Sequence, residues 1–173
     1  MSRIFMAALL SAALHAQNNP FTADVTQAYE RIKPDVVRAA ERMPEEYYGF
    51  RTTPDVRTYG QMIAHVADAQ LRMCAVVKGE TVSASAASKT SKADLVAALK
   101  ASFAYCDPVY DSMTDAAGAA KVKWARWEMT RLGLLNFNVT HDNEMYGTIA
   151  AFLRIKGQLP PSTEARPQAG AKK

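Results

Sequence analysis

The chain lacks the short motifs by which many enzyme classes are identified. Its 173 residues contain no glycine-rich phosphate loop, no GxSxG nucleophile turn, no CxxC pair and no HExxH zinc motif. Beyond residue 16, no hydrophobic run approaches the roughly 20 residues that a membrane-spanning helix needs. These absences argue against the enzyme classes that the motifs define. The lack of a long hydrophobic run also predicts that the mature chain has no membrane partner.

Charge of one sign is also scarce once the ends of the chain are set aside. The formal net charge is +4, but residues 17–161 carry 17 basic and 16 acidic side chains. A nucleic-acid-binding domain concentrates Lys and Arg on one face and needs a much larger excess of positive charge. The sequence therefore predicts that nucleic acid is not a partner.

Cysteine is nearly absent, since the chain contains only Cys74 and Cys106. In an oxidising compartment such an even pair can form a disulfide. Two buried, unpaired cysteines that pack as small hydrophobic residues are an equally good interpretation. The sequence alone leaves both interpretations open.

The first sixteen residues have the pattern of a secretory signal peptide. Arg3 provides a short positive region, residues 4–14 form an apolar run, and Ala16 precedes the polar Gln17. This pattern predicts an exported protein, either periplasmic or secreted. An apolar N-terminal helix packed on the rest of the protein is the alternative.

Apolar side chains recur at helical spacing in four segments that Pro, Gly and Ser residues separate. The predicted helices cover about 24–42, 58–78, 91–110 and 130–156. Helices of this length around one core predict an all-α four-helix bundle, which we place at residues 20–161. The polar residues 162–173 predict a disordered tail.

Local signals indicate where some of these helices begin and bend. Thr22 is the predicted N-cap of the first helix, and Pro34 inside that helix is predicted to bend or split it. Thr58 and Gln61 have the spacing of a capping box at the start of the second helix. No strong strand pattern is present, although the small, Gly-containing connector 115–123 could include a short hairpin.

Two histidines follow the leader, His65 on the second predicted helix and His141 on the fourth. Both lie on or beside the inward-facing side of their helix when residues are placed about 100° apart. Side chains on facing helices are the usual way in which bundles build metal sites. Hydrogen-bonded core histidines are the alternative interpretation.

Two acidic residues lie close to His141. Asp142 and Glu144 are turned away from the His141 direction by about 100° and 60°. Glu144 is the candidate for orienting a histidine or a water from a second shell. The alternative is that both carboxylates lie on a solvated flank of the helix.

Two pairs of segments resemble the DinB-like family, also described as the DinB and maleylpyruvate-isomerase superfamily. The first pair is RMPEEYYGFR (42–51) and RTYGQMIAHVAD (57–68). The second is HDNEMYG (141–147) and FLRIKG with two prolines (152–161). The resemblance extends over residues 20–161 and implies a four-helix bundle.

The resemblance also implies a metal centre. In this family one histidine of the second helix and two of the fourth, spaced HxxxH, hold a divalent metal that activates a low-molecular-weight thiol. His65 and His141 match the first two ligands, while Met145 stands at the third position. A thioether is a poor ligand for Zn²⁺ or Ni²⁺ but a tolerable one for Cu(I). The cofactor is therefore a divalent transition metal, Zn or Ni, or there is none.

Two functions follow from these observations. The first is a metal-dependent hydrolase or thiol transferase with a degenerate triad of His65, His141 and Met145, supported by Glu144. The second is a non-catalytic periplasmic bundle that binds a small molecule or forms a homodimer. The identity of the small molecule is not indicated by the sequence.

Overall fold

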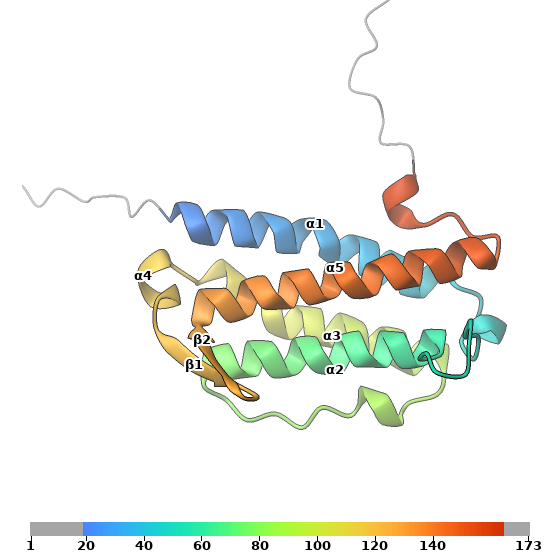
Figure 1. Cartoon of the computed structure of the whole chain (residues 1–173), viewed down its shortest axis with the longest axis horizontal. Helices are drawn as coiled ribbons and strands as arrows, with labels where there is room; N and C mark the ends of the chain where they lie inside the picture. The colour runs from blue at the N-terminus through green and yellow to red at the C-terminus, as the bar shows by residue number, and fades with distance from the viewer. Residues whose placement is uncertain (1–18, 165–173) are drawn as a thin grey trace, which may run out of the picture.

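Four long helices lie side by side in the computed structural model, which describes residues 19–164 (Figure 1). They are α1 (Pro20–Arg42), α2 (Tyr59–Lys78), α3 (Lys92–Asp111) and α5 (Arg131–Ile155). Helices α1 and α2 each pack against both α3 and α5, so that α1 and α2 stand at opposite corners of the bundle. The predicted all-α four-helix bundle is confirmed.

The connections determine which helices run in the same direction. After α1, residues 43–58, which include the 3-10 turn Glu45–Tyr47, cross one end of the bundle to reach α2. A long connector, residues 79–91, then returns along the bundle before α3 begins, so α2 and α3 are parallel (Figure 1). Helix α5 runs the opposite way to α2. The α2–α5 interface is therefore antiparallel.

The helix ends that the sequence predicted for α2 are confirmed. The Thr58 hydroxyl accepts a hydrogen bond from the backbone N–H of Gln61, and the Gln61 side chain accepts one from the N–H of Thr58, which completes the capping box. At the other end, Gly79 has a φ of 79°, a left-handed conformation that glycine adopts without strain.

The start of α1 differs from the prediction. The helix begins at Pro20 with Asn19 as N-cap, and Thr22 lies inside it. Proline is well suited to the first helical position, because its missing N–H would have no helical partner there. The Thr22 hydroxyl instead donates a 2.6 Å hydrogen bond to Asp115, which joins α1 to the segment after α3.

Pro34 does not split α1, which continues unbroken from Pro20 to Arg42. A proline within a helix removes one backbone hydrogen bond and crowds the preceding turn. Here the buried Ile32 and Val36, on either side of Pro34, pack into the core and hold the helix together.

A short hairpin follows the small helix α4 (Asp115–Gly118). Strand β1 (Lys121–Trp124) pairs antiparallel with β2 (Trp127–Thr130), so the hairpin begins within the connector 115–123 but extends beyond it. Its strands, KVKW and WEMT, do alternate polar and apolar residues, but each is only four residues long, which is too short to give a strong strand pattern. The turn between them places Ala125 at a φ of 52°.

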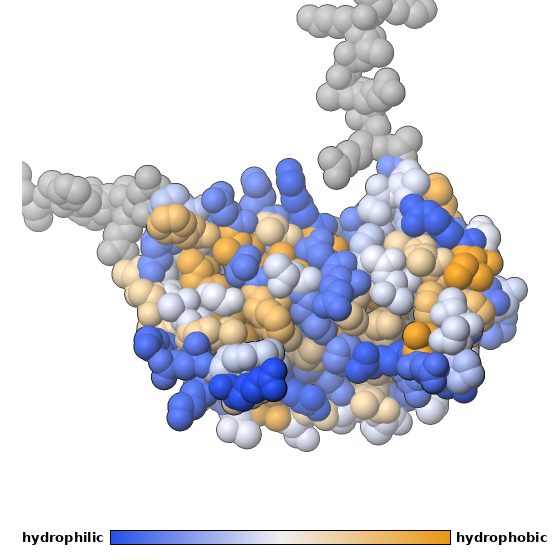
Figure 2. Space-filling view, viewed as in Figure 1, coloured by the Kyte–Doolittle hydropathy of each residue, from blue (hydrophilic) through white to orange (hydrophobic). Residues whose placement is uncertain are grey.

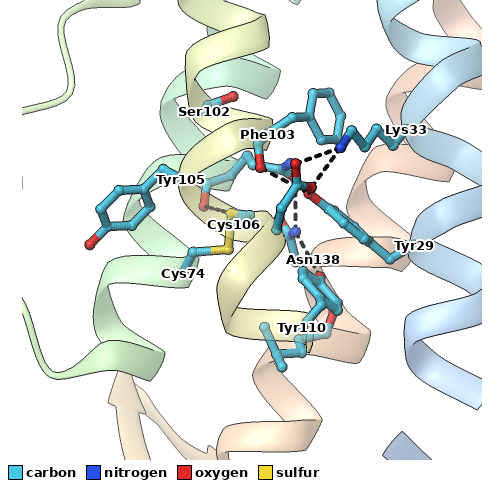
Figure 3. The surroundings of a disulfide bond; sticks show 12 residues. Tyr29, Lys33, Cys74, Ser102, Phe103, Tyr105, Cys106, Tyr110 and Asn138 are labelled. Carbon is cyan, nitrogen blue, oxygen red and sulfur yellow. Dashed lines mark hydrogen bonds and ion pairs between the residues drawn. A yellow bond between two sulfur atoms is a disulfide. The ribbon is translucent and has the colours of Figure 1, made fainter. Parts of the chain in front are cut away.

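A disulfide in the interior of the bundle joins α2 to α3. Cys74 and Cys106 form a disulfide, and both residues are fully buried (Figure 3). On the neighbouring side of α3, the ring of Tyr110 stacks on Tyr29 of α1 with centroids 3.8 Å apart.

The ordered fold extends slightly past residue 161. Pro161–Thr163 form a 3-10 turn, and the Tyr146 hydroxyl accepts a hydrogen bond from the backbone N–H of Ser162. The beginning of the segment predicted to be a disordered tail is therefore packed on α5. The rest of that segment and the predicted signal peptide, residues 1–16, lie outside the described residues. Between residues 19 and 164, no helix has the length and apolar character needed to cross a membrane.

Candidate functional site

The two histidines singled out from the sequence meet between α2 and α5. The Nε2 atoms of His65 and His141 are 3.0 Å apart, and their rings meet edge to face with centroids 5.0 Å apart. Both side chains are partly buried, and that of His141 is 12% exposed. Since α2 and α5 are antiparallel neighbours, residues 76 positions apart in the sequence are brought into direct contact.

The 3.0 Å distance between the two Nε2 atoms is compatible with two arrangements. One ring can donate its Nε2–H to the unprotonated Nε2 of the other, as in an ordinary hydrogen bond. Alternatively, both nitrogens can bind one ion, because two ligand nitrogens at about 2.0–2.1 Å from a tetrahedral zinc ion lie about 3.3 Å apart, only a few tenths of an ångström more than the distance here. The two imidazoles of His65 and His141 therefore fit a shared metal ion.

The surroundings of His65 favour its neutral form. Burial lowers the pKa of His65 below 6.5, and the positive charges of Arg57, His141 and Arg72 lower it further. A nearby carboxylate, Asp68, acts in the opposite direction with a smaller effect. Metals bind the neutral imidazole, so the local electrostatics favour the form that can act as a ligand.

The residue that the sequence analysis missed is Asp142. It is completely buried rather than on a solvated flank, and neither carboxylate oxygen has a hydrogen-bond partner within the described residues. Burial raises its pKa to about 6. One oxygen lies 3.8 Å from Nδ1 of His141, just beyond hydrogen-bonding distance.

Asp142 was missed because α5 is rotated about its own axis by part of a turn from the position assumed from the sequence. His141 was expected on or beside the inward-facing side of its helix, but it is only partly buried, as are Met145 and Thr148 above it. The buried positions that actually mark the stripe repeat at spacings of three and four residues: Asn138, Asp142, Tyr146, Ile149 and Leu153. A sequence signal was available, because this repeat is also helical and includes two large aliphatic residues and a tyrosine.

A buried polar layer lies next to the histidines. The Asn138 side-chain NH₂ group donates hydrogen bonds to the side-chain carbonyl of Gln70 at 2.8 Å and to the Tyr110 hydroxyl at 3.0 Å. Figure 3 shows Asn138 and Tyr110 beside the disulfide. Within residues 19–164, several buried atoms of this layer have no partner: Gln70 Nε2, Asn138 Oδ1, His141 Nδ1 and both carboxylate oxygens of Asp142. Such groups usually bind ordered water.

The other two predicted site residues lie farther from the histidine contact. Met145 follows His141 by one turn and packs against the core while remaining partly exposed. Glu144 is exposed, and among the described residues it has no hydrogen bond or ion pair. No group of three or more His, Cys, Asp or Glu side chains in that part of the chain is arranged to hold a metal. The site therefore consists of two imidazoles, one neighbouring carboxylate and a thioether one turn away.

A surface pocket of about 420 Å³ adjoins the site. His65 forms part of its wall, together with other residues of α2 and the end of the connector 79–91. The pocket gives a small molecule a route from solvent to one of the two histidines.

Solved structures with this fold include several DinB-like proteins. One from Bacillus cereus has a TM-score of 0.70 and 15% identity, covering 80% of this chain and 95% of its own. The DinB-like protein YjoA from Bacillus subtilis has a TM-score of 0.65 and 13% identity, covering 83% and 99%. A mutant of the mycothiol-dependent maleylpyruvate isomerase has a TM-score of 0.60 and 13% identity, covering 76% and 65%.

Sequence comparison agrees with the structural likeness. No match is found among curated protein sequences. The model of the DinB superfamily, however, matches residues 28–149, which include both histidines and Asp142. This match covers well over half of the 173 residues. The chain belongs to the DinB superfamily.

Proposed function

We propose that this DinB superfamily protein binds a transition metal ion between His65 and His141. The observation that carries the proposal is the 3.0 Å separation of the two Nε2 atoms at a partly buried position. The lowered pKa of His65 supports it, because the neutral ring is the one that binds metal.

The neighbouring residues have distinct roles in this proposal. Asp142 is close enough to Nδ1 of His141 to orient that ring after a small movement, as carboxylates beside metal-bound histidines commonly do. Met145 stands one turn beyond His141, where it favours a soft ion such as Cu(I) over Zn²⁺ or Ni²⁺. A bound ion of this kind supplies Lewis acidity, which lowers the pKa of a thiol or water.

The reaction class that we propose is either hydrolysis or thiol transfer, each dependent on the metal. Two observations support it: the resemblance of the segments around His65 and His141 to a thiol-activating family, and the structural similarity to an isomerase whose name specifies mycothiol. The pocket beside His65 provides space for a small substrate.

A second candidate is a non-catalytic bundle that binds a small molecule or pairs with another copy of itself. Met145 favours it, because the position lacks the third imidazole that would complete a strong metal site. Pairing is supported by Ile155 and Leu159, which are 56% and 54% exposed at the end of α5. Hydrophobic residues also gather at that end of the molecule in Figure 2.

We also propose that the protein works in an oxidising compartment. The disulfide between Cys74 and Cys106 supports this, because disulfides persist mainly in secreted and periplasmic proteins. The proposal agrees with the signal-peptide pattern of the first residues.

Elemental analysis of the purified protein tests the metal proposal. The protein would be prepared without chelator or polyhistidine tag, dialysed against Zn²⁺, Ni²⁺ or Cu(I) under anaerobic conditions, and then analysed by inductively coupled plasma mass spectrometry. We expect about one equivalent of one metal per chain. His65→Ala and His141→Ala should each lose it.

Thr140→Ala is the matched control, because Thr140 lies beside His141 on α5 but is exposed. This variant should keep the metal. No metal in the wild-type protein under any of the three conditions would overturn the proposal and favour the non-catalytic bundle. Metal that survives both histidine substitutions would place the ion elsewhere and would overturn it as well.

A further inference from the structure

The pocket beside His65 has an unusual concentration of positive charge. Three cationic side chains line it: Arg57 just before α2, Arg72 on α2 and Lys89 on the connector. Arg57 and Arg72 are exposed, and Lys89 is partly buried. Among the described residues, none of the three forms an ion pair, whereas Lys33, Lys100 and Lys121 are each paired with a carboxylate.

The single carboxylate of the pocket is already engaged. Asp68 is 6% exposed, and its two oxygens accept hydrogen bonds from the backbone N–H groups of Ala86 and Ala87 at 2.8 and 3.1 Å. These bonds tie the connector to α2. They also hold the Asp68 carboxylate in place, and it forms no ion pair with any of the three cations.

Asp68 thereby helps to build the pocket. The two residues that it holds belong to a 3-10 turn (Ala86–Ser88), and Lys89 follows that turn directly, with its backbone N–H bonded to the Ala86 carbonyl at 3.0 Å. The small side chains of Ala64 and Ala87 leave the space between the cations open. Lys89 is thus positioned across the pocket from the residues of α2.

Neutral donors add to this environment. The Gln61 carbonyl is occupied by the capping box, since it accepts the N–H of Thr58 at 2.9 Å. Gln61 lines the pocket, and its NH₂ group has no hydrogen-bond partner among the described residues. A planar guanidinium fork, a lysine ammonium and an amide NH₂ are the donors that recognise carboxylate and phosphate groups.

From this arrangement we propose that the pocket binds a small organic anion carrying carboxylate or phosphate groups, with Arg57, Arg72 and Lys89 as anchors at different points along the pocket. His65 forms the wall of the pocket and also contacts His141, so an anchored ligand has its other end at the histidine pair. The site needs no metal, and it therefore stands or falls independently of the function proposed above.

Titration of metal-free protein with two probes, inorganic phosphate and succinate, tests this proposal. Binding would be followed by ¹H–¹⁵N correlation spectra of the full chain in a low-salt buffer without phosphate. We expect saturable shifts of the Arg57 and Arg72 side-chain signals and of the backbone signals of 86–89. Saturation by phosphate alone would assign a phosphorylated ligand, and saturation by succinate alone a carboxylate; either supports the proposal.

Charge-matched variants separate a built site from general attraction. Arg72→Gln and Lys89→Gln should each weaken binding by about tenfold, the effect of losing one charge-assisted hydrogen bond. Lys123→Gln removes the same charge from the exposed hairpin and should leave affinity within about twofold, as surface charges contribute little. All of these positions except the partly buried Lys89 are exposed, so the fold should be retained, which circular dichroism would check.

Two results would overturn the proposal. One is the absence of saturable shifts with both probes. The other is an equal loss of affinity in Lys89→Gln and Lys123→Gln, which would mean that the probes respond only to the overall charge of the protein.

Discussion

Helix α2 makes two interfaces of opposite character. Against α3 it is closed by the Cys74–Cys106 disulfide, and both cysteines are completely buried. Against α5 it presents His65, which is partly buried, touches His141 and faces an open pocket. One helix therefore carries a covalent link on one side and the candidate site on the other.

The difference shows how a small bundle can hold a strained polar site. A buried carboxylate such as Asp142 lowers the stability of the folded state when it is ionised. A disulfide raises it by restricting the unfolded chain. The stability gained at the α2–α3 interface offsets the cost of burying His65 and Asp142.

Removing the disulfide should have the largest effect and should be confined to stability. The bond joins residues 32 positions apart, so the double variant Cys74→Ala/Cys106→Ala should lose about 3–4 kcal/mol of unfolding free energy. Urea unfolding measures this loss. Metal content, measured on the folded variant, should be unchanged. Loss of metal together with stability would show that the two interfaces are not independent.

Asp142→Asn should stabilise the metal-free protein at neutral pH by up to about 3 kcal/mol. Burial raises the Asp142 pKa from 3.8 to about 6, so the folded protein holds this proton more tightly than the unfolded chain does. The contribution of Asp142 therefore makes stability fall as the pH rises from about 4 to about 6. Asparagine has no charge to bury and removes that fall. Urea unfolding at about pH 4.5 and about pH 7.5 measures the effect.

The Asp142→Asn variant must be compared with the wild-type protein at each pH, because His65 changes the pH dependence of stability in the opposite direction. Its pKa is lowered, chiefly by burial, so its contribution to stability is lost as the pH falls below 6.5. Taking the difference between Asp142→Asn and the wild-type protein cancels this contribution. A difference of the same size at both pH values would contradict the prediction.

Met145→His should tighten metal binding by about tenfold or more, because even groups that only orient a metal ligand are worth about 10–100-fold. The new imidazole would stand one turn beyond His141, on the same side of α5. Competition with a chromophoric zinc chelator measures the affinity. Met145→Leu, which keeps the packing but offers no donor, is the control. Equal affinities of the two variants for Zn²⁺ would mean that position 145 does not face the ion.

The smallest effect is expected for Glu144→Gln, which should change metal affinity by less than about twofold because the side chain is exposed. In the same titration Asp142→Asn should weaken binding by about 10–100-fold, the usual effect of removing a group that orients a ligand. A larger loss of metal affinity in Glu144→Gln than in Asp142→Asn would mean that Glu144 orients the metal ligand, as the sequence alone suggested.

The helices were predictable because their ends carry local signals. Thr58 with Gln61, and Gly79, mark the limits of α2 through short-range hydrogen bonds and a left-handed residue. Such features depend on a few neighbouring residues only. The continuous path of α1 through Pro34 could not be seen in this way, because packing against two other helices outweighs the local cost.

The site was predictable only in part. His65 and His141 were recognised from their helical positions and from the resemblance. Asp142 was not, because a rotation of α5 by part of a turn decides which of two adjacent residues enters the core. The pocket could not be predicted from the sequence either, because it depends on the path of the connector 79–91, which carries no periodic signal.

The separation of 76 positions between His65 and His141 also bears on how the site is made. No local segment can assemble it, because the two rings meet only when α5, the last long helix to be synthesised, docks on α2. An ion held between them is therefore acquired at the end of folding, from whatever metals surround the chain at that moment. Under the proposed function, the metal bound should depend on the compartment in which the protein folds, so recombinant protein folded in the cytosol and protein folded after export need not carry the same ion.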